Sequence, residues 1–176
     1  MSWHSYQIAF NLHTKFRHYT GIDIIPDVCD KAKLLQIYFN NKLQDNKTID
    51  IVCKCSEDLL YDNKFIETHI DRYYTILWCP PYYDMEIYKG ENQSTNRYKS
   101  YNIWLDRYFR QTVELCKIVA YKSINTRIGI IMNDYNTLKG DYYNLINDMN
   151  NILIEYFDLC DVIELINRTS PLRVNK

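Results

Sequence analysis

Hydrophobic positions along the chain follow two different periods. Five short stretches are rich in Ile, Val, Tyr or Trp, approach the alternation of a strand, and end near charged or turn-forming residues. Four longer stretches repeat apolar residues at helical spacing. The expected strands are residues 19–25, 49–55, 73–79, 126–134 and 161–168, and the expected helices are residues 5–16, 26–43, 101–122 and 141–157.

The order of these elements predicts an α/β architecture. Strands and helices alternate, with a turn at 56–60 between the second and third strands. The crossovers are long enough to return the chain over a sheet, so we expect mostly parallel, right-handed connections with helices flanking the sheet. A chain of 176 residues is the size of one ordinary domain. We therefore expect a single domain over 1–176, ending in a flexible polar tail over 169–176.

Composition narrows the classes of partner and location. The formal net charge is −1, with basic residues scattered along the chain, so nucleic acid would have to bind through a local patch. The six cysteines show neither the paired spacing of a zinc site nor the density of a disulfide scaffold, so we expect reduced thiols and no metal. No signal-like or membrane-length apolar run is present. We expect a soluble intracellular protein that does not enter a membrane.

Polar residues follow the expected strands at their carboxyl ends, where ligands sit in parallel sheets. The groups are Asp23, residues 55–58, residues 79–82 and residues 133–134. Asp23 could accept hydrogen bonds from ribose hydroxyls or form an Asx turn that caps the next helix. Glu57 and Asp58 could receive an adenine amino group or cap the following turn. The sequence leaves both pairs of alternatives open.

The loop after the third expected strand is stiff and aromatic. Pro80 and Pro81 fix the backbone and remove two donors, which leaves the carbonyls of residues 79 and 80 available to a ligand. Tyr82 offers a flat face for stacking. Such a loop suits a planar base whose amine needs nearby acceptors, although a proline-stopped strand with a core tyrosine explains the same residues.

Residues 79–116, CPPYYDMEIYKGENQSTNRYKSYNIWLDRYFRQTVELC, resemble the motif region of phage and giant-virus amino-directed DNA methyltransferases. The family loop is Asp, Asn or Ser followed by Pro-Pro-Tyr or Pro-Pro-Phe. Upstream, YTGIDIIPDV resembles the second strand of the family and SEDLL resembles its adenine-contacting segment. Shared positions after the loop are Gln93, Ser94, Tyr98, Tyr101, Trp104, Tyr108 and Cys116.

The resemblance implies a Rossmann-like fold and transfer of a methyl group from S-adenosylmethionine to N6 of adenine or N4 of cytosine in DNA, after base flipping. Asp23 would then hold the cofactor ribose, and Glu57 or Asp58 would bind its adenine. Tyr82 would stack on the target base, while Cys79 and the carbonyl of Pro80 orient the amine. A viral origin would place the protein in the host cytoplasm.

The chain departs from the family at two places. The glycine-rich turn that closes on the cofactor is replaced by Ser2-Trp3-His4, and the first strand before it is missing, so we expect open edges on the neighbouring strands. Trp3 would stand at the cofactor. Cys79 replaces an oxygen-bearing side chain, and sulfur is a weak acceptor.

Three functions are compatible with these residues. The first expectation is a degenerate or truncated relative, a pseudoenzyme that keeps weak base or partner binding. The second is an active DNA methyltransferase completed by a partner chain. The third is a non-catalytic interaction protein that pairs with a protein partner through an open sheet edge. DNA recognition would fall to residues 84–100, with Lys89, Arg97 and Lys99, unless these form only a solvated surface loop.

Overall fold

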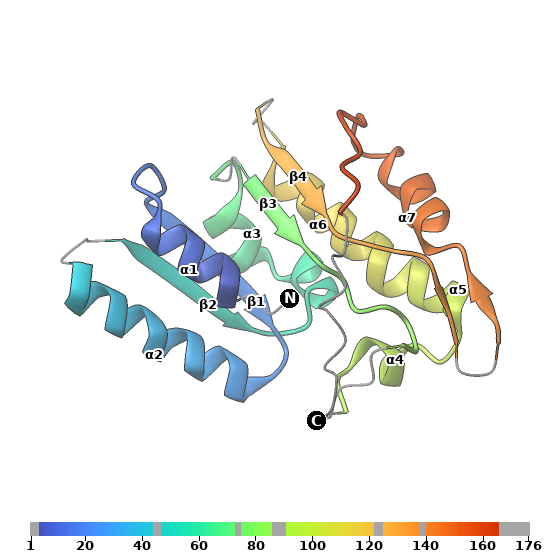
Figure 1. Ribbon diagram of the computed structural model, residues 1–176, viewed down its shortest axis with the longest axis horizontal. Helices are drawn as coiled ribbons and strands as arrows, with labels where there is room; N and C mark the ends of the chain where they lie inside the picture. The colour runs from blue at the N-terminus through green and yellow to red at the C-terminus, as the bar shows by residue number, and fades with distance from the viewer. Residues whose placement is uncertain are drawn as a thin grey trace, which may run out of the picture.

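The computed structural model describes residues 4–43, 47–72, 75–85, 91–121, 125–137 and 140–165 (Figure 1). Helices and strands alternate through most of this length. The elements are α1 (His4–Leu12), β1 (His18–Asp23), α2 (Pro26–Leu43), β2 (Thr48–Cys53), the 3₁₀ helix η1 (Glu57–Tyr61), α3 (Asn63–His69), β3 (Thr75–Trp78), α4 (Ser94–Arg97), α5 (Tyr101–Trp104), the π-helical turn η2 (Leu105–Arg110), α6 (Gln111–Val119), β4 (Arg127–Ile130), β5 (Tyr135–Asn136), β6 (Tyr142–Tyr143) and α7 (Leu145–Leu153).

The described strands form three separate pairs. β1 pairs in parallel with β2, with Gly21 opposite Ile51, and β3 pairs in parallel with β4, with Leu77 opposite Gly129. The third pair is a short antiparallel hairpin of β5 and β6. In Figure 1 the arrows of β2, β3 and β4 point the same way, so the carboxyl ends of both parallel pairs face one end of the molecule.

One layer of helices covers both parallel pairs. Ile22 of β1 and Ile76 of β3 pack against the same buried cluster, which is formed by Leu59, Phe65, Leu115 and Val119 of η1, α3 and α6. The opposite face of β1 carries Tyr19, whose ring lies 5.5 Å from that of Phe10 in α1. Because side chains alternate across a strand, α1 and the α6 layer lie on opposite faces of β1.

The face of β3 that points away from the α6 layer is more exposed. Leu77 points away from the α6 layer, is 54% exposed, and lies over Gly129 of β4. A β-carbon on Gly129 would stand 3.0 Å from Leu77 Cδ2, so the absence of a side chain there lets Leu77 lie close to the sheet. The two parallel pairs therefore share a cover on one face only.

α5, η2 and α6 form one continuous helix over residues 101–119. Its start is capped by Ser100, whose hydroxyl accepts from the Ile103 amide, and the junctions at Leu105 and Gln111 keep helical dihedrals. The predicted apolar stripe of this helix is confirmed at Trp104, Tyr108, Phe109 and Val113, which are buried with residues of α7 and the hairpin. The turn η2 is a single π-helical segment inside this helix.

Most predicted elements are confirmed with shifted ends. The expected helix over 26–43 matches α2, because Pro26 begins it and helical spacing runs to Leu43. The expected helix over 141–157 is wrong at its start, since Tyr142 and Tyr143 pair with β5 after a turn at Gly140, where φ is 91°. α3 was not predicted and begins at an Asp62 cap.

The expected last strand over 161–168 is wrong for residues 161–165. These residues are exposed and pair with no strand among the described residues. A strand needs a neighbouring edge to pair with as well as apolar alternation, and alternation alone is what the sequence supplies here. Residues 166–168 and the expected tail over 169–176 lie outside the described residues. Within the described ranges, no helix has the length and apolar character needed to cross a membrane.

Candidate functional site at the carboxyl ends of the strands

Three of the predicted site residues influence the pKa of one buried tyrosine, Tyr108. Burial raises the pKa of Tyr108 well above its ordinary value, and the charges of Glu57, Cys79 and Asp23 raise it further. All three groups therefore lie within electrostatic range of the same phenol. Asp23 ends β1, Glu57 begins η1 and Cys79 follows β3.

Asp23 ends β1 and forms the Asx turn that was one of its two interpretations. Its Oδ1 accepts from the Ile25 amide at 2.9 Å, directly before α2 begins at Pro26. The Cys29 thiol approaches the Asp23 carbonyl at 3.6 Å. The Asp23 side chain is half-buried.

Glu57 and Asp58 are both held by Arg97. The guanidinium donates to Glu57 Oε1 at 2.9 Å and to Asp58 Oδ1 at 2.6 Å, and Tyr98 Oη donates to Glu57 at 3.3 Å. Glu57 is 2% exposed. Burial raises the pKa of its carboxyl while Arg97 lowers it, and burial together with Glu57 raises the pKa of Tyr98 to about 12. Both acids assigned to adenine are thus occupied by a side chain of the same chain.

A cavity of about 730 Å³ opens beyond the end of β2, beside this ion pair. Its charged groups are paired with one another, because Lys54 contacts Asp62 at 2.7 Å and Arg97 contacts Asp58. A ligand entering the cavity would meet ion pairs instead of an excess of positive or negative charge. The lining residues are Cys53, Lys54, Cys55, Asp58, Tyr61, Asp62, Asn63, Asn92 and Arg97.

The proline loop that follows β3 is held by a backbone hydrogen bond and by an aromatic contact. Pro80 is fully buried, and the Trp78 carbonyl accepts from the Ile131 amide at 2.9 Å, which fixes the loop against the chain after β4. Tyr82 stacks on Tyr135, with ring centroids 6.0 Å apart and an interplanar angle of 24°. Cys79 and Tyr82 are half-buried, so both stand at the surface of the site.

Beneath Tyr82 lies an aromatic platform, which we define as Tyr83, Tyr101, Trp104, Tyr135 and Tyr143. Ring centroids within it approach to 4.3 Å for Tyr101 and Tyr143 and to 5.8 Å for Tyr83 and Trp104. Several of its polar tips have partners: Tyr135 Oη donates to Asp84 at 2.8 Å and Tyr83 Oη donates to the Lys99 carbonyl at 2.9 Å. Tyr82 contacts this platform through the ring of Tyr135.

The Gln93-Ser94 segment of the resemblance serves packing. Trp104 Nε1 donates to Ser94 Oγ at 3.0 Å, and both residues are buried. The hydrogen bond ties α4 to the long helix. A packing role therefore accounts for Ser94 and for its spacing from Trp104.

Two further predicted positions are Asp134, which makes other contacts, and Trp3. Asp134 accepts from Tyr142 Oη and from the Ile146 amide, both at 2.9 Å, and so fixes the hairpin to α7. Trp3 lies outside the described residues. In the described ranges, no three His, Cys, Asp or Glu side chains are grouped as metal ligands.

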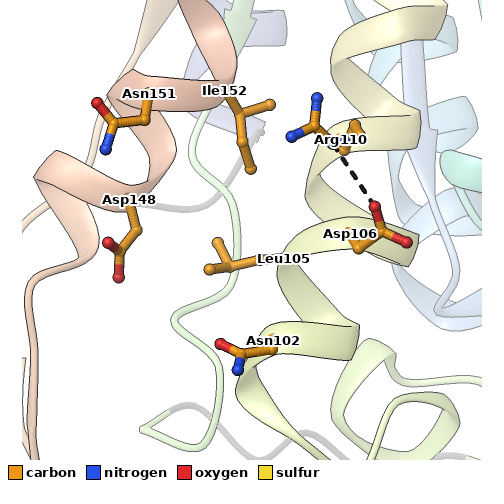
Figure 2. A pocket seen from close by; sticks show the side chains of 7 residues that line it. All are labelled: Asn102, Leu105, Asp106, Arg110, Asp148, Asn151 and Ile152. Atoms are coloured by element: carbon orange, nitrogen blue, oxygen red, sulfur yellow. Dashed lines mark ion pairs between the residues drawn. The ribbon is translucent and has the colours of Figure 1, made fainter.

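A second cavity of about 280 Å³ lies between the long helix and α7, away from the strand ends (Figure 2). Leu105 and Ile152 point into it, and Arg110 pairs with Asp106 at 3.6 Å on its rim and also with Glu155. No pattern in the sequence indicates this cavity or the Arg97 contacts, which join residues 39 and 40 positions apart. For the Arg97 contacts, the only signal in the sequence is the positive charge of Arg97 within residues 84–100.

Comparisons with known proteins add no family to this geometry. The chain matches no protein-family model, no curated protein and no solved structure. The function therefore rests on the residues and their arrangement.

Proposed function

We propose that the chain is a non-catalytic relative of the S-adenosylmethionine-dependent DNA amino-methyltransferases that binds an unpaired nucleic-acid base at the proline loop. The observation that carries the proposal is Tyr82, which is half-buried and stacked on Tyr135 above the aromatic platform. A tyrosine held this way loses little freedom when a base stacks on it. Stacking is also tolerant of base identity, because every base has a flat face.

Three features support loss of methyl transfer. Arg97 occupies Glu57 and Asp58, the acids that the resemblance assigns to the cofactor adenine. Cys79 stands where the family has an oxygen acceptor for the target amine, and thiol sulfur accepts weakly. The four glycines of the chain, at 21, 90, 129 and 140, form no glycine-rich turn around a tryptophan. Cofactor binding and amine orientation are both weakened, while the stacking platform is kept.

Binding of single-stranded oligonucleotides tests this function. Stacking one base on an aromatic ring contributes about 1–3 kcal/mol, so Tyr82→Ala is expected to weaken binding of labelled oligo(dA) or oligo(dC) at least about fivefold. Fluorescence anisotropy at fixed salt measures the dissociation constants, since salt alone shifts them. Tyr121→Ala is the matched control, because Tyr121 is 70% exposed at the far end of α6. Equal binding by wild type and Tyr82→Ala would contradict base stacking at this loop.

A further inference from the structure

Two cysteines from different elements meet at Asp23, the last residue of β1. Cys53 ends β2 and stands opposite Asp23 in the parallel ladder. Cys29 lies in the first turn of α2, and its thiol donates to the Asp23 carbonyl at 3.6 Å. Both cysteines are free thiols. The same residue of β1 is therefore the neighbour of both.

Strand alternation directs the Cys53 side chain toward α2. Val52, the residue before it, packs on the buried cluster of the α6 layer, so Cys53 points to the opposite face of β2. α1 lies on that face, and α2 is tied to α1 because Gln7 donates to the Ala32 carbonyl at 2.8 Å. α2 also contacts both strands, and Cys29 is on its buried side. The side chains of the two cysteines therefore occupy the same space between the strands and α2.

The two thiols differ in their access to solvent. Cys29 is 0% exposed, and burial, followed by a hydrogen bond with Cys53, raises the pKa of its thiol to about 12. Cys53 is exposed and lines the cavity of about 730 Å³ beyond the end of β2. A cysteine reacts with an oxidant as an accessible thiolate. Cys53 is therefore the thiol that a dissolved oxidant reaches first, with Cys29 beside it as the second thiol.

We propose that Cys53 and Cys29 are a peroxide-reactive pair that closes to a disulfide between β2 and α2. The Cys53 thiolate attacks one oxygen of hydrogen peroxide, the O–O bond breaks, and a sulfenic acid and the first water form. The Cys29 sulfur then attacks the Cys53 sulfur, the S–O bond breaks, and the second water leaves with the Cys29 proton. Two thiols lose two electrons and two protons, and the peroxide is reduced to two water molecules. This reaction is independent of base binding at the proline loop.

Peptide mapping after oxidation identifies the bond. Lysines lie between Cys29, Cys53 and Cys55, so trypsin places these three cysteines in different peptides. The folded, reduced chain is treated with hydrogen peroxide, its remaining thiols are alkylated, and it is digested without reductant. Mass spectrometry is expected to find the Cys29 and Cys53 peptides joined as the main linked product, and dithiothreitol should separate them. A folded chain that gives no such product, or that joins Cys53 mainly to Cys55, would overturn the proposal.

Single replacements separate the roles of the two thiols. Cys29→Ser should stop the reaction at the sulfenic acid, so dimedone should label the Cys53 peptide of this variant more than that of the wild type. Cys53→Ser, at an exposed position, should leave the Cys29 peptide unlinked. The matched control is Cys160→Ser, because Cys160 is also an exposed free thiol, and it should leave the linked product unchanged. Loss of the product in Cys160→Ser would contradict the assignment of the pair.

Thermal unfolding gives a second readout that does not depend on the mapping. A disulfide that closes the chain between positions 29 and 53 restricts the unfolded state, so oxidation should raise the melting temperature of the wild type by several degrees. Dithiothreitol should reverse the rise, and Cys53→Ser should show none. An equal rise in Cys53→Ser would assign the effect to other thiols and contradict the proposal.

Discussion

At the residue scale, Arg97 of α4 forms ion pairs with the buried carboxylate of Glu57 and with Asp58. The guanidinium also lies over the ring of Tyr98, whose hydroxyl donates to Glu57. A buried carboxylate costs free energy unless it is paired and hydrogen-bonded. The ion pair therefore stabilises the position of residues 91–100 over the end of η1. It also removes both acids from any ligand that would need them.

The stability of Arg97→Ala should depend on pH in a defined direction. Burial raises the Glu57 pKa, so this group favours folding most below its ordinary value of 4.5, and that contribution declines as pH rises through the folded-state pKa. Arg97 opposes the rise. Its removal should cost about 2 kcal/mol at neutral pH, with less lost on acidification. Urea unfolding at pH 7 and pH 5 measures the difference.

Lys99→Ala is the control for this prediction, because Lys99 is an exposed cation in the same segment. Its unfolding midpoint should match that of the wild type at both pH values. A loss in Arg97→Ala that is equal at pH 7 and pH 5 would mean that the Arg97 contact to Glu57 is not the source of the stability.

At the element scale, α3 depends on its cap. Asp62 Oδ1 accepts from the Phe65 amide at 3.0 Å, and Oδ2 binds Lys54 at 2.7 Å. The helix is only seven residues long, so its stability comes from this cap and from burying Phe65 and His69 on one side. Phe65 and Ile66 then cover the strands from the α6 layer.

Replacing Asp62 separates the cap from the ion pair. Asp62→Ala removes both, whereas Asp62→Asn keeps a cap acceptor, so the alanine variant should unfold several degrees lower than the asparagine variant. The Lys54 hydrogen bond and then the Phe65 amide lower the pKa of Asp62 below 3.8. The advantage of aspartate over asparagine at this position is therefore complete above that value and is lost as pH falls through the folded-state pKa. Thermal unfolding followed by circular dichroism, from neutral to acid pH, shows whether the order Asp, Asn, Ala holds.

Helices and strands with a clear local sequence pattern were predicted. Pro26 and helical spacing predicted α2, and the alternating apolar runs predicted the four long strands. α3 was missed because seven residues give little periodicity. The strand expected over 161–168 does not form over its described part, 161–165, because apolar alternation does not supply a partner edge. The ion pair of Arg97 with Glu57 could not be predicted, since it joins distant positions with no local pattern.

At the scale of the whole molecule, the protein consists of two parallel strand pairs on one helical layer, with the candidate site at their shared carboxyl end. The sequence placed Asp23, Glu57 and Cys79 at or after the ends of expected strands, and all three raise the pKa of Tyr108. The Asx turn of Asp23 was one of its two interpretations from the sequence, whereas the binding of Glu57 and Asp58 by Arg97 was not predicted.

The most direct test of the proposed function is calorimetric titration of the chain with S-adenosylmethionine and S-adenosylhomocysteine, after cooperative unfolding has shown that the sample is folded. The account predicts no binding heat from either compound, because Arg97 occupies Glu57 and Asp58 and the sequence holds no glycine-rich turn. Micromolar binding of S-adenosylmethionine by the folded chain, followed by methyl transfer to DNA, would contradict it.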